Sequence, residues 1–329
     1  MAPLAPPVAA VRLAVRKALT QLPSSAAPIL VACSGGADSL ALASAAAFVA
    51  ARMGMRAGLV TVDHGLQEGS AQRATAVAEW AAKLDFEPVE VATVTVAGRT
   101  GGPEAAARAA RYEALVAAAR RHDAAAVLLG HTRDDQAETV LLALARGAGP
   151  RGLSGMPAVR ELAGVRMLRP LLDVSRAETR EACAALGLTP WEDPHNADPA
   201  YARARVRSSA LPALVEVLGP GVVANLARTA GLLAADTAAL DALAGSALDA
   251  ARAADGAVRV AALAELLPAL RTRVLHAWAR ELGAAAAALS HRHVVALDAL
   301  VTDWHGQGAV HLPGGILVAR RDGRLVRSR

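Results

Sequence analysis

The sequence contains few cysteines, few aromatic residues and almost no lysine. Its two cysteines, Cys33 and Cys183, lie far apart in apolar contexts, which argues against a disulfide framework or a metal site. We expect each to be a small buried hydrophobic residue. Aromatic residues make up 2% of the chain, too few for an extended platform on which bases could stack. Lys17 and Lys83 are the only lysines, so arginine carries almost all of the positive charge.

Length, hydropathy and charge indicate how many domains to expect, whether the chain contacts a membrane and what kind of partner it binds. The 329 residues exceed the size at which one core usually keeps growing, so two domains are expected. No apolar run reaches the roughly 18 residues that span a bilayer, and the N-terminus does not resemble a secretory signal. We therefore expect a cytoplasmic protein that does not contact a membrane. The net charge of +5 and the pI near 10.0 favour a polyanionic partner, held by arginines and by shape.

Apolar runs alternate with helix-like segments through the first two thirds of the chain. The pattern predicts strands at 29–33, 57–62, 88–96 and 125–129, and helices at 8–22, 40–50, 70–84, 103–121 and 175–187. Such alternation is typical of an α/β fold with a doubly wound, mostly parallel sheet, which binds ligands beyond the carboxyl ends of its strands. Ser34, Asp63 and His131 fall at such ends. Glycine-rich stretches at 98–102 and 147–170 predict loops, the second one long, functional and containing a short hairpin.

The pattern changes after about residue 212, where helices dominate. They are predicted at 220–253, 262–283 and 290–304, and a hairpin at 309–326 closes the chain. We place the domain boundary near Leu211–Pro212. This gives an α/β domain at 1–211 and a smaller, mainly helical domain at 212–329.

The most informative motif lies between the first predicted strand and the next helix. It consists of Ser34, Gly35, Gly36, Ala37, Asp38 and Ser39. Adjacent glycines let the backbone approach a phosphate closely, and a helix N-terminus offers unpaired N–H groups and a partial positive charge. The motif therefore predicts a cradle for the phosphates of a nucleotide.

Asp38 distinguishes this motif from a Walker A loop, which places a lysine on the outer phosphates. A carboxylate beside a triphosphate makes sense if Mg²⁺ lies between them, because Mg²⁺ is usually held by one or two carboxylates and phosphate oxygens. The alternative is that Asp38 and Ser39 only cap a helix. The strand and helix on either side favour the phosphate interpretation.

A second motif, at 130–139, contains three acidic residues within five positions. Asp134 or Asp135 can share one face of a helix start with Glu138. Such a group could hold Mg²⁺ or an ammonium group. The alternative is that the acids complement the helix dipole. The glycine-rich loop that follows at 147–149 favours a function.

Two further pairs of residues are candidates for the site, and for each pair a functional and a structural interpretation fit the sequence equally well. Arg108 and Arg111 either form part of a solvated helix face or contact a phosphate or a developing negative charge. Asp63 and His64, after the second predicted strand, either face a ligand or form a local cap.

Together these motifs resemble the tRNA(Ile)-lysidine synthases of the PP-loop ATP pyrophosphatase superfamily. The matching stretches are SGGADS, DHGL, PEAAARAARY, GHTRDDQAET, RGAGPRGLSGM, RPLL and EDPHN…RARVR, in the family's order across 31–207. The first motif alone also occurs in GMP, NAD and asparagine synthetases and in tRNA thiolases, whereas the ordered set is far more specific. The C-terminal third resembles the family's helical substrate-binding region weakly.

The resemblance implies that free L-lysine is ligated to the wobble cytidine of a tRNA(Ile) with a CAU anticodon. The C2 oxygen of cytosine would attack the α-phosphate of ATP, and the amine of lysine would then displace AMP. The product, lysidine, changes codon reading from AUG to AUA and amino-acid identity from Met to Ile. ATP is the co-substrate and Mg²⁺ the implied metal. Oligomeric state is left open, with a homodimer among the options.

The resemblance also implies roles for particular residues. The loop 34–39 would hold pyrophosphate, with Asp38 placing Mg²⁺, while the backbone near Asp63 and His131 would contact adenosine. Asp135 and Glu138 are the candidates for gripping or deprotonating the lysine amine. The arginines that would neutralise the adenylate or bind RNA are Arg108, Arg111, Arg203, Arg205 and Arg207. Arg320, Arg321 and Arg324 are candidates for reading tRNA identity.

One position departs from the family pattern, and three other functions compete. Ala204 stands where the family usually has asparagine between arginines, which puts that local contact in doubt. A tRNA thiolase would need cysteines to carry sulfur or hold a cluster, and no Cys-x-x-Cys pair is present. An amidating synthetase would need an ammonia source or a glutaminase domain, for which the length leaves little room. An inert RNA-binding module would not need the acidic and glycine motifs.

Overall fold

The computed structural model describes residues 4–23, 26–63, 65, 69–95, 103–192, 198–286 and 288–328. The chain divides into two compact units, 1–233 and 234–329. It passes from one unit to the other within the long helix α10 (Val222–Ala251). The functional boundary that the sequence places at 211/212 stays a prediction.

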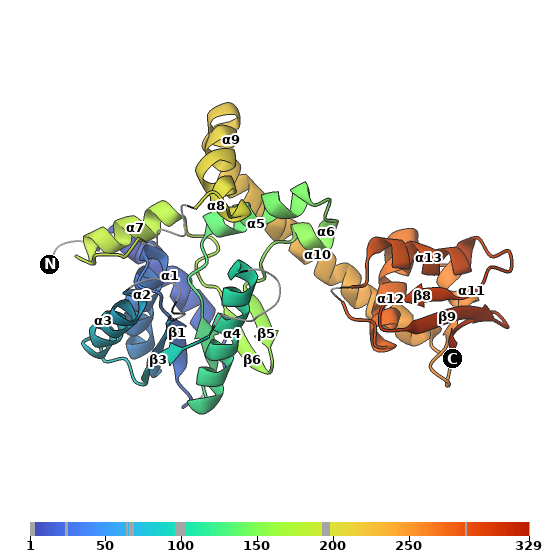
Figure 1. The fold of residues 1–329 in the computed structure, drawn as a ribbon, viewed down its shortest axis with the longest axis horizontal. Helices are drawn as coiled ribbons and strands as arrows, with labels where there is room; N and C mark the ends of the chain where they lie inside the picture. The colour runs from blue at the N-terminus through green and yellow to red at the C-terminus, as the bar shows by residue number, and fades with distance from the viewer. Residues whose placement is uncertain are drawn as a thin grey trace. The chain divides into compact units, whose positions relative to one another are not determined.

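A six-stranded sheet forms the centre of the first unit, in the order β3-β2-β1-β4-β6-β5 (Figure 1). Its strands are β1 (Ile29–Ala32), β2 (Ala57–Asp63), β3 (Val89–Thr93), β4 (Ala126–Leu128), β5 (Val159–Leu162) and β6 (Val165–Leu168). Neighbouring strands from β3 to β6 are parallel, and β5 is antiparallel at the edge. This confirms the predicted doubly wound, mostly parallel α/β fold.

Helices cover both faces of the sheet because side chains of a strand point alternately to its two faces. Ile29 and Val31 join a core with residues of α1, α2, α3 and α7, whereas Leu30 joins a core with α4 (Figure 1). These helices are α1 (Pro6–Leu19), α2 (Ala37–Arg52), α3 (Ser70–Ala82), α4 (Pro103–Arg121) and α7 (Arg176–Ala185). The strand, loop and helix order predicted around residues 29–50 is confirmed.

The structure contains elements that the sequence patterns did not indicate. The hairpin predicted within 147–170 is present as β5 and β6, but β6 is also a parallel strand of the central sheet, and α6 (Pro150–Leu153) precedes the hairpin. Four-residue strands carrying arginine are too short and polar to show a buried pattern. The arginine cluster after residue 200 is helical, forming α8 (Ala202–Arg205), the π-helical turn η2 (Val206–Ala210) and α9 (Leu211–Leu218).

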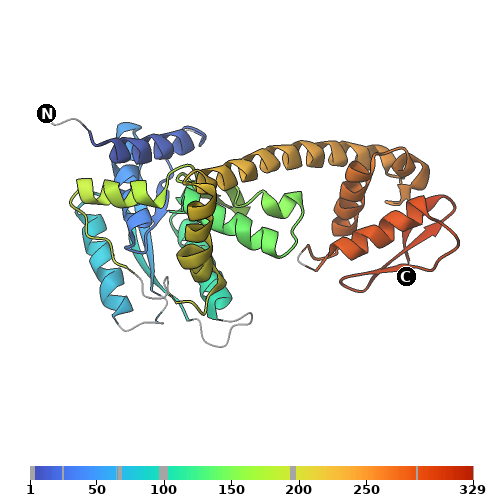
Figure 2. The same ribbon diagram turned by 90° about the horizontal axis from the view of Figure 1, so that it is seen from above.

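The second unit joins helices to a small antiparallel sheet, in the order β7-β10-β9-β8. Its elements are β7 (Val258–Arg259), α11 (Val260–Ala264), α12 (Pro268–Glu281), α13 (His291–Thr302), β8 (Val310–Leu312), β9 (Ile316–Arg321) and β10 (Arg324–Ser328). Helix α13 lies against α12, β8 and β9 (Figure 2). The prediction of a single helix at 262–283 is wrong. Helix α11 ends at Ala264, and Pro268, which lacks an N–H, begins the new helix α12. The closing hairpin is confirmed by β9 and β10.

One described helix, α10, is long and apolar enough to cross a membrane by length and composition. This is weak evidence, because helices of soluble proteins can pass the same test. Three aspartates, Asp236, Asp241 and Asp249, interrupt its apolar sequence.

Candidate active site

The strand order of the central sheet reverses between β1 and β4. Strands β2 and β3 lie on one side of β1, and β4 and β6 lie on the other. Doubly wound sheets bind ligands at the carboxyl ends of the strands beside such a reversal. Ser34 follows β1 there, and His131 follows β4.

The loop after β1, which we call the phosphate loop (residues 34–39), is closed by its own hydrogen bonds. The Ser39 Oγ accepts the backbone N–H of Ser34 at 3.1 Å and donates to the carbonyl oxygen of Gly36 at 2.9 Å. Gly35 has φ +83°, in the left-handed region that favours glycine. At the start of α2, the cap residue Gly36 has no side chain that bonds the first N–H groups of the helix. These N–H groups can therefore donate to a phosphate, as a phosphate site requires.

Gly130, at the end of β4, packs directly against the phosphate loop. A Cβ atom at Gly130 would lie 3.2 Å from the carbonyl carbon and oxygen of Asp38 and from the nitrogen of Ser39. A side chain there would push against the backbone of the first turn of α2. This close approach explains why a glycine precedes His131.

The Asp38 carboxylate points toward α7. It accepts a hydrogen bond from the Thr179 hydroxyl at Oδ1, and its Oδ2 lies 3.8 Å from Nε of Arg176. Burial raises the pKa of Asp38 to about 6, with the nearby Asp135 carboxylate adding to the rise. A largely buried carboxylate with a raised pKa is stabilised by a cation, so Asp38 fits a Mg²⁺ ligand.

Asp135 and Glu138, in α5 (Arg133–Ala145), form an acidic pair surrounded by three arginines. The Glu138 side chain is 0% exposed and accepts hydrogen bonds from Nε of Arg203 and Nε of Arg207, both at 2.8 Å. Nη2 of Arg176 donates to Oε1 of Glu138 at 3.1 Å and to Oδ1 of Asp135 at 3.0 Å. Arg203 and Arg207 also lie 3.4 and 3.3 Å from that Oδ1.

The N-terminal cap of α5 fixes Asp135. Its Oδ2 accepts the backbone N–H of Thr132 at 2.8 Å and the Thr132 hydroxyl at 3.1 Å, a capping box. Burial alone would raise the pKa of Asp135, but Arg176, Arg203 and the Thr132 amide outweigh it, so the pKa is lowered. Asp135 is therefore ionised. Its Oδ2 accepts the hydrogen bonds of the helix cap, and its Oδ1 faces the arginines.

His131 lies between the acidic pair and a group of arginines. Burial and, to a smaller extent, Arg169, Arg108 and Arg203 together lower the pKa of His131 to about 3, against the opposing effect of Asp135. The ring is therefore neutral, and its buried Nδ1 has no hydrogen-bond partner among the described residues. An uncharged imidazole at this sheet edge suits contact with a base.

Comparisons with known proteins agree with this geometry. A family model described as a PP-loop domain matches residues 11–214, and a model described as the TilS substrate binding domain matches 259–326. The tRNA(Ile)-lysidine synthase of Salinispora tropica is 71% identical over 99% of this chain and 97% of that protein. That of Thermobifida fusca is 58% identical over 98% of this chain and 97% of that protein. The chain belongs to the tRNA(Ile)-lysidine synthase family.

A solved structure with a similar fold is that of a tRNA thiolase. The U34-tRNA thiolase NcsA from Methanococcus maripaludis, solved with its [4Fe-4S] cluster, has a TM-score of 0.57 and 19% identity. The match covers 69% of this chain and 80% of that chain. In this member of the lysidine synthase family, Cys33 and Cys183 are both free and buried, as the sequence predicts. Burial raises the pKa of Cys33, and it raises the pKa of Cys183 to about 11, so neither is poised as a thiolate.

The other predicted site residues have different surroundings. Asp63, at the end of β2, is buried, and its Oδ1 accepts the N–H of Gly65 at 3.0 Å. The Arg108 Nη2 lies 3.4 Å from the Tyr112 hydroxyl on α4, whereas the Arg111 side chain is exposed. Arg205 donates to the carbonyls of Pro199 and Ala200 and does not join the acidic pair. His64, the turn at Asp193–Pro194 and the loop at 98–102 lie outside the described residues.

Three residues of the site were missed by the sequence analysis. Arg176 and Thr179 lie in the first turn of α7. The only sequence signal near them is the capping box of Ser175 and Glu178, which marks the start of this helix. Arg169 is 3% exposed, and its Nη1 donates to the Pro157 carbonyl at 2.7 Å, which ties the end of β6 to the preceding loop. Capping boxes show where a helix begins but not which distant side chain it faces.

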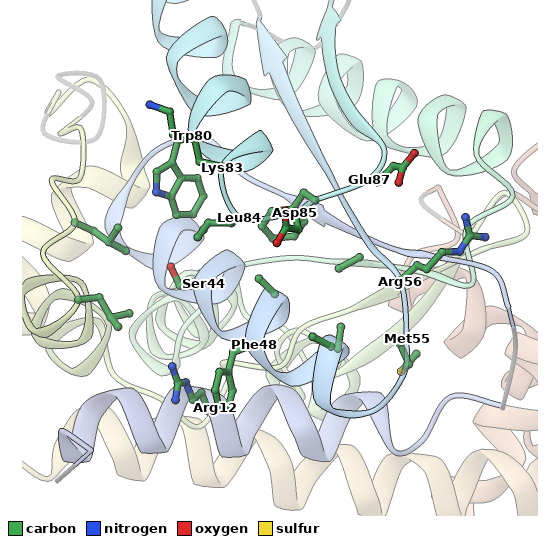
Figure 3. A pocket seen from close by; sticks show the side chains of 17 residues that line it. Arg12, Ser44, Phe48, Met55, Arg56, Trp80, Lys83, Leu84, Asp85 and Glu87 are labelled. Atoms are coloured by element: carbon green, nitrogen blue, oxygen red, sulfur yellow. The ribbon is translucent and has the colours of Figure 1, made fainter. Parts of the chain in front are cut away.

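A separate cavity of about 620 Å³ lies beside the segments that lead into β2 and β3, where Met55, Arg56 and Glu87 line it (Figure 3). Its lining includes Phe48, Trp80 and Lys83, and none of its residues belongs to the phosphate loop or the acidic pair. The Arg12 guanidinium lies over Phe48, 3.5 Å from the ring centroid (Figure 3). The lining of this cavity is therefore distinct from the phosphate loop and from the acidic pair.

Proposed function

We propose that this enzyme ligates L-lysine to C2 of the wobble cytidine of a CAU-anticodon tRNA(Ile), consuming ATP and releasing AMP and pyrophosphate. One observation carries the proposal: Arg176 pairs with Asp38 of the phosphate loop and also with the acidic pair. A site for a leaving pyrophosphate and a site for an amine thus share one network. Family membership supports the same reaction.

The first step uses the phosphate loop. The C2 oxygen of cytosine attacks the α-phosphate of ATP, and the bond to pyrophosphate breaks. The N–H groups of the first turn of α2 would hold the leaving pyrophosphate, and Asp38 would hold Mg²⁺, which neutralises phosphate charge. The neutral His131 and the backbone near Asp63 would face the adenosine, while Arg108 and Arg111 would stabilise the phosphate of the adenylate.

The second step uses the acidic pair. Asp135 and Glu138 would hold lysine and take up the proton that its amine loses as it attacks C2 and displaces AMP. Holding the amine and the adenylated base together can contribute about 7–11 kcal/mol toward the barrier. Arg203 and Glu138 form an ion pair at 2.8 Å, so the roles proposed for these two residues require that pair to open. A negatively charged adenylate would attract the guanidinium and leave the carboxylate to lysine.

Arginines outside this network would bind the tRNA. Arg205 is exposed in the first unit, and Arg320, Arg321 and Arg324 belong to the region that matches the substrate-binding family model. Among these, Arg320 donates to the Leu300 carbonyl at 3.0 Å, so only part of its guanidinium would face RNA. A cytoplasmic location is part of the same proposal, whereas a homodimer stays one option among several.

Mass analysis of the anticodon nucleoside tests the proposal directly. We expect tRNA(Ile) transcript incubated with enzyme, ATP and lysine to gain the mass of lysine less one water at the wobble cytidine. Omitting lysine should allow pyrophosphate release without that product, and methionine tRNA with the same anticodon should stay unmodified. An unmodified isoleucine tRNA, with bound but unconsumed ATP, would instead indicate an inert RNA-binding module.

A further inference from the structure

The first turn of α7 connects the two halves of the active site. Nη2 of Arg176 lies 3.0 Å from Asp135 Oδ1 and 3.1 Å from Glu138 Oε1, while its Nε lies 3.8 Å from Asp38 Oδ2. Thr179, three residues later in the same turn, donates to the other Asp38 oxygen. Two side chains of one helical turn thus determine where Asp38 lies relative to the acidic pair.

Arg176 differs from the other two arginines of the cluster in what it reaches. Arg203 and Arg207 form ion pairs with Asp135 and Glu138. Within the described part of the chain, the ion pairs of Asp38 include Arg176 but neither of these two. Arg176 is therefore the arginine that connects the Asp38 carboxylate of the phosphate loop to the acidic pair.

The backbone holds Arg176 firmly in place. Its own N–H donates to Asp134 Oδ2 at 2.8 Å, which joins the start of α7 to the start of α5. The preceding residue, Ser175, forms a capping box with Glu178, and the N–H of Arg133 donates to the Val174 carbonyl at 2.9 Å. Because these bonds do not involve the guanidinium, they keep the residue in place whatever ligand occupies the site.

We propose that Arg176 is a positioning residue that sets the distance between Asp38 and the acidic pair, so that both half-reactions use one preorganised geometry. This inference rests on the proposed function. A planar guanidinium can direct N–H groups to several carboxylates at once, whereas an ammonium group is a point charge on a flexible stem. Arginine, and not positive charge alone, is therefore required here.

The test separates pyrophosphate release without lysine from lysine-dependent AMP release. We expect Arg176→Gln to slow both by roughly 10- to 100-fold, because misplacement by about 1 Å can cost 100-fold in rate. The reductions should appear in kcat, with a smaller change in the Kd for ATP measured by calorimetry on the free enzyme. Arg176→Lys keeps the charge and the fold but should still lose about 10-fold in both steps.

Arg180→Gln is the matched control. Arg180 lies on the same helix, and its exposed ion pair with Glu192 has side chains that are 62% and 81% exposed. This variant should keep both rates within twofold, because exposed pairs contribute little. Melting temperatures of all three variants identify any that has simply unfolded.

Three outcomes would overturn the inference. Wild-type rates in Arg176→Gln would show that the network does not position the reacting groups. Full recovery in Arg176→Lys would show that charge alone suffices. Loss of only one half-reaction would show that Arg176 serves one site and does not connect two. A wild-type enzyme that forms no lysidine would instead refute the proposed function, independently of any variant.

Discussion

Arginines pair with acids in different ways in the two units. In the second unit, several pairs join one arginine to one acid, as in Arg271 with Asp298 at 2.6 Å and Arg252 with Glu281 at 2.6 Å. In the first unit three arginines converge on Asp135 and Glu138. One-to-one pairs hold a fold together, whereas a shared network can exchange partners when a charged substrate arrives.

The largest effect is expected from removing the buried carboxylate of the network. Glu138→Gln should reduce lysine-dependent AMP release by about 100-fold or more, while ATP binding survives, because the amine loses its anion and base. Its unfolding free energy should also fall, since removing one partner of a buried pair costs about 3–5 kcal/mol. Single-turnover AMP release and urea unfolding measure the two effects.

The one-to-one pairs supply the control for this variant. Glu281→Gln removes a half-exposed acid from Arg252 in the second unit. It should keep AMP release unchanged and cost less than about 1 kcal/mol of unfolding free energy. If Glu138→Gln turns over like Glu281→Gln, Glu138 does not act on lysine.

The next effect concerns the contact between β4 and the phosphate loop. Gly130→Ala places a Cβ 3.2 Å from the backbone of Asp38 and Ser39, so the first turn of α2 must shift. We expect pyrophosphate release to fall by about 10-fold, with an unfolding cost of about 1–3 kcal/mol from overpacking.

Gly245→Ala, in α10 of the second unit, is the comparison for Gly130→Ala. A Cβ at Gly245 meets nothing within 4 Å, so alanine should stabilise the helix by about 0.5–1 kcal/mol. Thermal unfolding and pyrophosphate release of both variants check the contrast. Equal behaviour would mean that the close approach at Gly130 does not constrain the loop.

The sequence predicted the parts of this site that arise from neighbouring residues. The order of strand, loop and helix around residues 29–50 was predicted correctly, because buried periodicity and glycine pairs are local signals. Arg176 was missed because its partners lie 38 and 41 residues away, and only the folded sheet brings α7 beside α5. Gly130 was part of a predicted motif, but the sequence did not show why a glycine is needed there. The need comes from its close approach to the backbone of Asp38, which depends on the order of the strands in the sheet.

The pH dependence of stability provides a smaller effect, centred on Asp38. Its pKa of about 6 in the folded protein lies above the ordinary value of 3.8 for an aspartate, so the folded state binds the proton more tightly than the unfolded state. Stability from this group therefore falls as pH rises from about 4 to 6. Asp38→Asn should be more stable than wild type at pH 7.5 by about 2 kcal/mol, a difference that disappears below pH 4. Urea unfolding at both pH values checks the sign, and a destabilised variant at pH 7.5 would contradict it.

The smallest effect on stability is expected at an exposed pair in the second unit. Arg324 Nη1 lies 3.1 Å from Asp255 Oδ2, and the side chains are 41% and 56% exposed. Arg324→Gln should change the unfolding free energy by less than about 1 kcal/mol, because solvent screens such pairs. If Arg324 contacts a tRNA phosphate, the same variant should weaken tRNA binding and reduce the salt slope by about 1.

Asp255→Asn separates the two roles of Arg324. It breaks the same ion pair but frees the guanidinium and removes a negative charge. We therefore expect tRNA binding to be unchanged or tighter, measured as Kd against salt concentration. Weakening by both variants would show that the pair supports the local fold. Weakening by Arg324→Gln alone would mean that one-to-one pairs of the second unit also supply arginines to RNA, and the contrast between the two units would then be one of degree.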